Sequence, residues 1–330
     1  MKKILFSVLA IAAFAACSTE EQIAAPKGEA IAFGNAFVDN SVRADAATDP
    51  SHTTSNLTKF NVYGAVNRVN IFDGDEVSGT VGADVWNFTD TTTLKQYWIP
   101  GAPYKFVAVV DGNKTGATVT NTNTTTGLPE TITYTVDGKT DLLCEVVNIN
   151  SAAADQGVVG FTFSHLLSKV KFSVKNKTNA QATNYRIAIT EAKITNAYEA
   201  GVYDVNKDAW TPGTLGSFTL QNLIIPSNKT EYNESEILLI PTTAASTVAD
   251  DDADVKVGLY IKANIEATSN GTDWTPVSAV EKTFANVIAL DTAHAYHFIV
   301  ELGIGNEIKF TATALTDWAD GDGANDTTLN

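Results

Sequence analysis

The clearest structural signal in the sequence lies at residues 255–265, which read VKVGLYIKANI. Every second residue from Val255 to Ile265 is apolar, and the residues between them are lysine, glycine, tyrosine or asparagine. Successive side chains of a β-strand point to opposite faces, so this alternation places one face on a core and the other toward solvent. The stretch therefore predicts a long strand in a half-buried sheet.

Shorter stretches of the same character recur along the chain, and turn residues separate them. Thr, Val and Ile are frequent, and their branched side chains favour strands, whereas convincing amphipathic helical patterns are scarce. Many short strands with few helices predict an all-β fold of antiparallel β-sandwiches. We expect strands at residues 31–37, 59–66, 104–110, 131–136, 142–147, 158–163, 166–174, 185–195, 218–225, 237–240, 295–302 and 308–314.

Three local patterns refine this picture. Apolar residues from Val170 to Val174 alternate with polar ones that include Lys169 and Lys171, which predicts a sheet with one wet face. Residues 115–126 are almost entirely Thr, Asn and Gly, and predict a surface loop or an edge hairpin. The dipeptide at 137–138, Asp-Gly, is the turn signal between the strands expected before and after it.

Length and composition predict two domains. A chain of 330 residues with 44% hydrophobic residues is long enough for two real cores. The small and polar stretch at 151–157 marks the boundary. We therefore expect an N-terminal β-sandwich at residues 31–160 and a C-terminal β-sandwich at residues 161–330.

The first residues have the form of an export signal. Lys2 and Lys3 precede an apolar run from Ile4 to Phe14, and two alanines then lead directly into Cys17. The run is too short to span a bilayer as a helix, and it fits a signal peptide at residues 1–16. A cysteine directly after the small residues predicts lipoprotein processing, with lipid attached to Cys17 and residues 17–30 as the tether. An ordinary secreted protein with an incidental cysteine is the alternative.

Charge and motif content exclude several functions. The net charge of −16 repels phosphate, so we expect no nucleic-acid partner. Only Cys144 remains besides Cys17, which excludes a disulfide in the lipidated chain and a cysteine metal site. No nucleophile elbow, zinc-protease motif or phosphate loop occurs, so we expect no catalytic residue, no metal and no cofactor. The five Trp residues are candidates for sugar stacking, although core packing is the commoner use.

Residues 163–170, FSHLLSKV, resemble the signature of the fimbrillin family, the type V pilus subunits of Gram-negative anaerobes. Four further segments resemble the family in the expected order: 57–64, 98–109, 140–143 and 296–318. Together they span nearly the whole mature chain. The signature positions, which we expect to be structural, are Phe163, His165, Leu167, Ser168, Lys169 and Val170.

The resemblance implies a structural protein with two transthyretin-like β-sandwich domains in tandem. Family members begin as lipoprotein precursors on the outer membrane, and a protease removes their first strand. The groove left behind accepts a strand from a neighbouring subunit, which builds the fimbria by donor-strand exchange. In this chain the removed strand would carry Ile31, Phe33 and Phe37, and we expect cleavage between Arg43 and Ala44.

Several alternatives stay open from the sequence alone. The chain also fits an accessory, tip or anchor subunit of a fimbria, because only a short acidic tail follows Trp318. A surface glycan-binding lipoprotein shares the signal and the sandwiches, and a surface hydrolase is a weaker third reading. We expect other pilus subunits and the outer membrane as partners, with a host glycan or protein as the adhesion ligand.

Overall fold

The structure is a computed structural model of the chain. It describes residues 29–38, 57–80, 85–93, 95–112, 116–153, 155–177, 184–220, 224–226, 231–243, 254–303 and 308–315. The predicted all-β class is confirmed, since these residues form largely antiparallel sheets and contain no helix. It follows that no helix in this part of the chain is long and apolar enough to cross a membrane.

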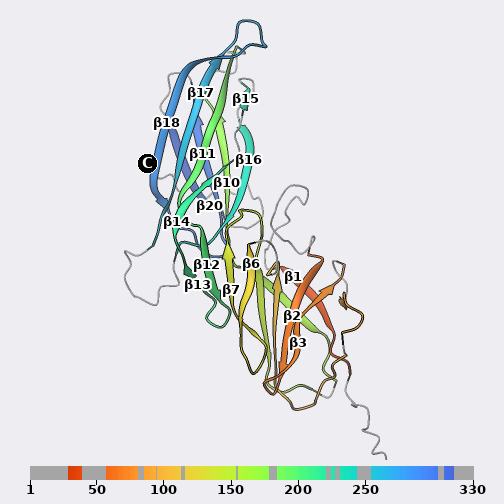
Figure 1. Cartoon of the computed structure of the whole chain (residues 1–330). Coiled ribbons are helices and arrows are strands. Elements are labelled where there is room, and N and C mark those ends of the chain that lie inside the picture. The colour runs from red at the N-terminus through yellow and green to blue at the C-terminus, as the bar shows by residue number, and fades with distance from the viewer. Residues whose placement is uncertain are drawn as a thin grey trace, which may run out of the picture.

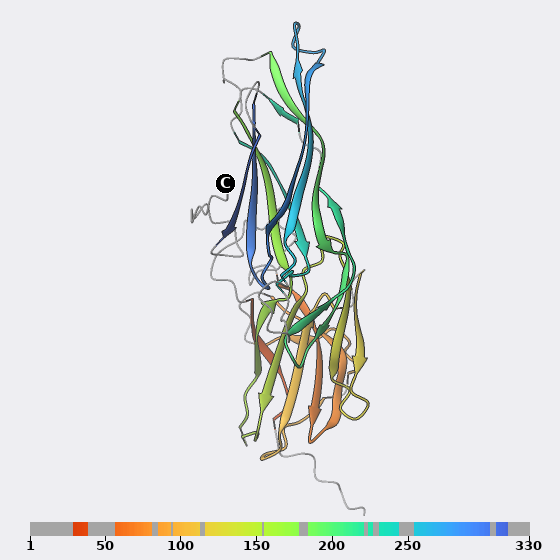
Figure 2. The ribbon, with the colours of Figure 1, turned by 90° about the vertical axis from the view of Figure 1, so that its left-hand side faces the viewer.

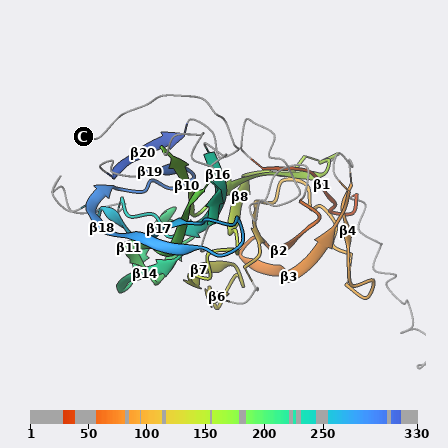
Figure 3. The same ribbon diagram turned by 90° about the horizontal axis from the view of Figure 1, so that it is seen from above.

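A seven-stranded sheet forms the base of the N-terminal half, in the order β1-β9-β8-β5-β2-β3-β4. All its neighbours pair antiparallel except β1 and β9, which run parallel. Seen from above, β1 lies across from β2 and β3, so the sheet is strongly curled (Figure 3). The strands are β1 (Phe33–Val38), β2 (Lys59–Val66), β3 (Val69–Ser78), β4 (Asn87–Phe88), β5 (Tyr104–Val110), β8 (Leu143–Ile149) and β9 (Val159–His165).

A second sheet packs on the other face of this curled sheet. Its order is β13-β12-β7-β6, with β6 (Ala117–Thr122), β7 (Pro129–Thr135), β12 (Ala200–Asp204) and β13 (Ala209–Pro212). The β6–β7 pair confirms the edge hairpin, one of the two structures that the sequence allowed for residues 115–126. The β12–β13 hairpin comes from beyond residue 160 yet pairs with β7, so the two halves of the chain share a sheet.

The C-terminal half contains two further sheets that face one another. One has the order β16-β10-β19-β20, and the other has the order β14-β11-β17-β18, with β15 also pairing with β11. Their apolar faces enclose a single core. The molecule is elongated, with this pair of sheets above the N-terminal pair (Figures 1 and 2). The strands are β10 (Ser168–Asn176), β11 (Tyr185–Tyr198), β14 (Leu215–Thr219), β15 (Ile224–Pro226), β16 (Glu231–Leu239), β17 (Val257–Ala267), β18 (Thr275–Ile288), β19 (Ala295–Leu302) and β20 (Lys309–Leu315).

The expectation of a wet face on β10 is wrong. Lys169, Lys171 and Ser173 are all buried, at 1%, 6% and 2% exposure. Lys169 lies where the two halves of the molecule meet, because its pairing partner Leu238 also bridges to Gly138. Both lysines interact with other groups, as burial of an ammonium requires. Alternation in the sequence identified the strand, but it could not show that both faces are covered.

The turn at Asp137 is present, but it joins strands of different sheets and not a hairpin. β7 pairs with β6 and β12, whereas β8 pairs with β5 and β9. The Asp137 carboxylate accepts hydrogen bonds from the backbone N–H groups of Lys139 and Thr140, at 2.8 and 2.7 Å, and from the Thr140 hydroxyl at 2.6 Å. Burial alone would raise the pKa of Asp137, but these bonds outweigh it and hold the pKa below its usual value.

This turn makes stability depend on pH. A lowered folded-state pKa stabilises the fold above the unfolded pKa, about 3.9, and the gain is lost as pH falls through the folded pKa. We expect Asp137→Asn to lower the free energy of unfolding by about 1 kcal/mol at pH 7, and the deficit to shrink below about pH 4. Urea unfolding at pH 7 and at a pH below about 4 measures the deficit at each pH. The exposed Asp254→Asn serves as the control, and an equal deficit at both pH values would contradict the assignment.

Candidate strand-binding site

The first described strand, β1, lies at one end of the seven-stranded sheet, where its only neighbour in the sheet order is β9. It pairs in parallel with β9, with Phe33 opposite Val159 and Val38 opposite Phe163. No other strand of the described chain follows it in the sheet order. β1 is therefore the terminal strand of this sheet, and it pairs in parallel whereas the other neighbours in the sheet pair antiparallel.

The N-terminal part of this segment is hydrogen-bonded on its other side as well. The Ile31 N–H donates to the Gln96 carbonyl at 2.8 Å, and the Trp98 N–H donates to the Glu29 carbonyl at 3.0 Å. The Trp86 N–H donates to the Phe33 carbonyl at 2.7 Å. Two walls thus enclose the strand: β9 on one side, and Trp86 with residues 96–98 on the other. We call this arrangement the β1-binding site.

Phe33 fills the centre of the site. Its ring is fully buried and lies 5.4 Å from that of Phe72, 5.8 Å from that of Phe106 and 5.9 Å from that of Phe161, measured between ring centroids. Ile31 is also buried, at 5% exposure, and both residues belong to the same core cluster. The strand thus contributes the ring around which the aromatic side chains of the N-terminal core are arranged.

Phe37 does not fill the site as predicted. It is 46% exposed, whereas Ala36 and Val38 are buried. A β-bulge between Gly34 and Ala36 adds one residue, so the inward positions change from odd to even numbers. A pattern of alternating residues assumes a regular strand, so the sequence alone does not show that Phe37 faces solvent while Ile31 and Phe33 face the core.

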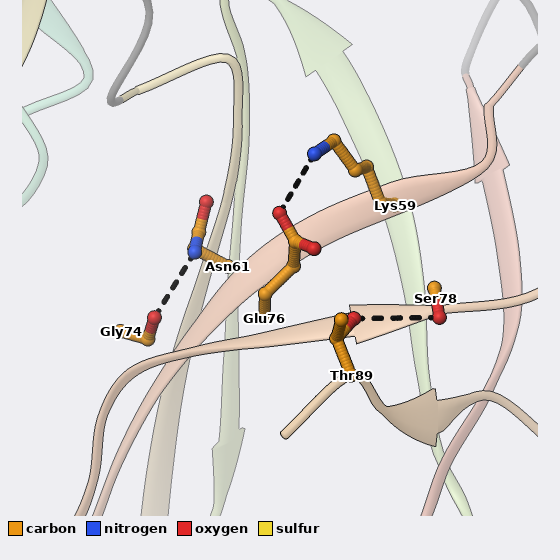
Figure 4. Close-up of polar contacts among 6 residues, drawn as sticks. All are labelled: Lys59, Asn61, Gly74, Glu76, Ser78 and Thr89. Atoms are coloured by element: carbon orange, nitrogen blue, oxygen red, sulfur yellow. Dashed lines mark hydrogen bonds and ion pairs between the residues drawn. The ribbon is translucent and has the colours of Figure 1, made fainter.

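Polar contacts join β2 to β3 and hold Thr89 against β3 (Figure 4). The Lys59 ammonium contacts the Glu76 carboxylate at 2.8 Å between β2 and β3, which raises the pKa of Lys59 and lowers that of Glu76. The Asn61 amide donates to the Gly74 carbonyl at 3.0 Å. Thr89, which directly follows β4, donates its N–H to the Glu76 carbonyl at 2.9 Å and its hydroxyl to Ser78 at 3.4 Å. The two Thr89 contacts hold the short segment that carries Trp86 against β3.

The two tryptophans of the wall opposite β9 pack in the core, which is the commoner of the two uses that the sequence allowed for them. Trp86 and Trp98 are 3% and 1% exposed, so neither is free to stack on a sugar. Trp86 packs 5.2 Å from Phe60, and Trp98 packs 6.0 Å from Phe106. Their spacing in the sequence does not predict contact with the segment that contains β1, because the curl of the sheet brings these distant residues together.

The FSHLLSKV signature lies beside this site, and its two ends are buried in different cores. Phe163 and Val170 are fully buried and belong to the N-terminal and C-terminal cores, and Leu167 belongs to the core between the two N-terminal sheets. Ser168 donates to the Asp291 carbonyl at 2.8 Å. The predicted structural role is consistent with this placement, since eight consecutive residues connect three cores.

His165 is buried in contact with Asp141. Its Nδ1 lies 3.1 Å and 3.0 Å from the two carboxylate oxygens, and both side chains are excluded from solvent. A buried pair of this kind is costly to break, because either partner alone leaves a buried polar group. The geometry supports a structural histidine at the point where β9 ends.

The remaining positions named from the sequence are the sites of lipidation and cleavage and the second cysteine. Cys17, Arg43 and Ala44 lie outside the described residues. Cys144 is buried, which raises the pKa of its thiol to about 12 and makes it unreactive. In the described ranges, no three His, Cys, Asp or Glu residues come together in a way that could hold a metal ion.

Comparison with known proteins identifies the family. The family model described as fimbrillin-like matches residues 44–318. The chain belongs to the fimbrillin-like family. The match covers most of the chain, and it begins directly after Arg43 and leaves β1 outside.

Solved structures with the same fold are fimbrial and cell adhesion proteins. A fimbrial protein from Bacteroides vulgatus and a putative cell adhesion protein from Bacteroides uniformis each align with a TM-score of 0.55 at 15% identity, over 88% of this chain and 99% of theirs. A putative cell adhesion protein from Bacteroides ovatus aligns with a TM-score of 0.51 at 14% identity, over 89% and 99%. At these identities the likeness is one of fold. None of the curated proteins matches the sequence significantly.

Two phenylalanines of the same strand test the β1-binding site in the intact precursor. We expect Phe33→Ala to lower the free energy of unfolding by about 3–5 kcal/mol, because it leaves a cavity among four rings. Phe37→Ala is the matched control and should change it by no more than about 0.5 kcal/mol, because the side chain faces solvent. Chemical denaturation of both variants gives the comparison, and equal losses would refute the inward and outward assignments.

Proposed function

We propose that this fimbrillin-like chain is a fimbrial subunit that assembles by donor-strand exchange at the β1-binding site. The observation that carries the proposal is the position of β1: a strand at the end of a sheet supplies the central ring of the N-terminal core. Such a strand can be replaced by another of matching pattern without change to the other strands of the sheet.

Maturation would create the acceptor. β1 ends at Val38, and Arg43 follows five residues later. A cut after Arg43 would release the lipid anchor on Cys17 together with β1. The family match supports this, because it begins at Ala44 and therefore covers the part of the chain that would remain.

Loss of β1 would leave a template for another strand. The edge of β9 would lose its ladder partner, and the rings of Phe72, Phe106 and Phe161 would lose their contact with Phe33. Unpaired backbone groups and exposed apolar side chains favour addition of an extended segment. A donor strand from a second subunit would restore both the hydrogen bonds and the aromatic core.

The last strand, β20, has the pattern that this site requires. Ile31 and Phe33, which lie just before and at the start of β1, are separated by one residue, and Ile308 and Phe310 repeat this spacing where β20 begins. β20 ends its sheet, so it can leave by breaking a single ladder. In its own sandwich Phe310 is only half-buried, against Phe298 and Phe284. We propose β20 of a second subunit as the donor, which makes this chain a polymerising subunit on the cell surface.

Peptide competition tests the acceptor. We expect cleavage of the purified precursor after Arg43 to give SDS-resistant ladders, and a peptide of residues 29–38 to suppress them. The same peptide with Phe33→Ala should lose its effect, and the peptide with Phe37→Ala should keep it. Arg43→Ala precursor is the uncleaved control. Failure to form ladders, or equal potency of the two alanine peptides, would refute strand exchange at this site.

Disulfide trapping tests the donor. If Phe310 takes the place of Phe33, Thr311 takes the place of Gly34 and lies opposite Gly160 of the acceptor. Under conditions that dissociate the ladders of the cleaved chain without new cysteines, we expect the ladders of a cleaved chain with Gly160→Cys and Thr311→Cys to persist until reducing agent is added. Such a disulfide joins two chains, because Thr311 pairs with Ile299 within its own chain. Gly160→Cys with Thr272→Cys is the control. Ladders of the double variant that dissociate under the same conditions without reducing agent would show that another segment is the donor.

A further inference from the structure

One end of the N-terminal half is built around the point where β1 begins. β1 and β9 run parallel, and β9 ends at His165 beside the junction with the C-terminal half, so β1 begins at the end remote from that junction. Backbone hydrogen bonds link the loops at this end. The Trp98 N–H donates to the Glu29 carbonyl, the Ala102 N–H to the Ile99 carbonyl, and the Asn67 N–H to the Pro103 carbonyl. We call this surface, formed by residues 29–30, 67–69 and 97–103, the distal end.

Apolar side chains gather at the distal end. Val69 is 63% exposed, Ile99 is 52% exposed and Tyr97 is 38% exposed. They are three of the seven large apolar side chains that are exposed in the described ranges. Arg68, also exposed, directly precedes Val69 in the turn. Single exposed apolar residues need no explanation, but a group on neighbouring loops marks a contact surface for a protein or a membrane.

The length of the preceding chain favours a membrane as the occupant. Glu29 follows Cys17 by twelve residues. Fully extended, this stretch reaches about 40 Å, and a flexible chain of this length has a typical end-to-end distance of about 20 Å. If Cys17 carries lipid, the distal end is therefore the part of the folded protein that is held next to the bilayer.

We infer that the distal end rests on the lipid surface in the precursor, with Val69, Tyr97 and Ile99 at the boundary between headgroups and acyl chains. A tyrosine with an apolar body and a polar tip suits this boundary, and the exposed Arg68 can contact lipid phosphates. The contact would orient the precursor with its C-terminal half pointing away from the membrane. The inference rests on the proposed lipidation of Cys17.

Site-specific fluorescence in vesicles tests this orientation. The lipidated precursor with Ile99→Cys is labelled with the environment-sensitive fluorophore NBD and incorporated into phosphatidylethanolamine–phosphatidylglycerol vesicles. Val277→Cys is the matched control, because it is 56% exposed in the C-terminal half. The label is confined to the new cysteine, since Cys17 is acylated and Cys144 is buried. We expect brominated lipids to quench most of the emission at position 99 and to leave position 277 unchanged, and Val69→Cys to behave like Ile99→Cys.

The outcomes separate this inference from the proposed anchor. Protein that fails to float with the vesicles would refute lipidation, and the inference would fall with it. Protein that floats but shows no lipid quenching at position 99 would refute the inference alone. A label at position 99 that is shielded from water without lipid quenching would overturn it in favour of contact with a second copy of the chain.

Discussion

The N-terminal half depends on one packing constraint: its core has to receive an aromatic ring at the position of Phe33. That ring contacts aromatic side chains from β3, β5 and β9, and from β4 at 5.9 Å. Interiors are close-packed, so a missing ring cannot be replaced by water or by relaxation of its neighbours without loss of stability. The core is therefore incomplete unless a strand with this ring lies between β9 and the wall that contains Trp86. Whether the strand belongs to the same chain or to another is not dictated by the packing.

Several contacts join the two halves of the molecule beside that site. The FSHLLSKV segment passes through all three core clusters, and the β12–β13 hairpin adds two strands from the C-terminal half to the N-terminal pair of sheets. The Trp210 indole strengthens this link by donating to the Leu166 carbonyl at 2.7 Å in a buried position. None of these connections passes through β1, so the two halves are joined independently of that strand.

Some strands could be predicted from the sequence in full, whereas for others the sequence did not show which side chains are buried. Regular strands such as β17 were evident, because apolar and polar residues that alternate over many positions are typical of a strand and not of a helix. Phe37 faces solvent because a bulge shifts the alternation of the strand. The wet face expected for Lys169 and Lys171 is wrong because both faces of β10 are covered. Bulges and burial at a junction depend on residues far away in the chain, so no local pattern contains them.

The sequence by itself determined the all-β class, most of the strands, the fimbrillin signature and the presence of an apolar strand ahead of Arg43. These follow from side-chain periodicity and residue type, which are local properties. Only the tertiary structure decided that β1 joins β9 in parallel, that Trp86 and Trp98 form the opposite wall, and that residues 200–212 complete the N-terminal pair of sheets. Pairing between distant strands is a property of the folded chain, because it is selected by how well whole faces fill a common core.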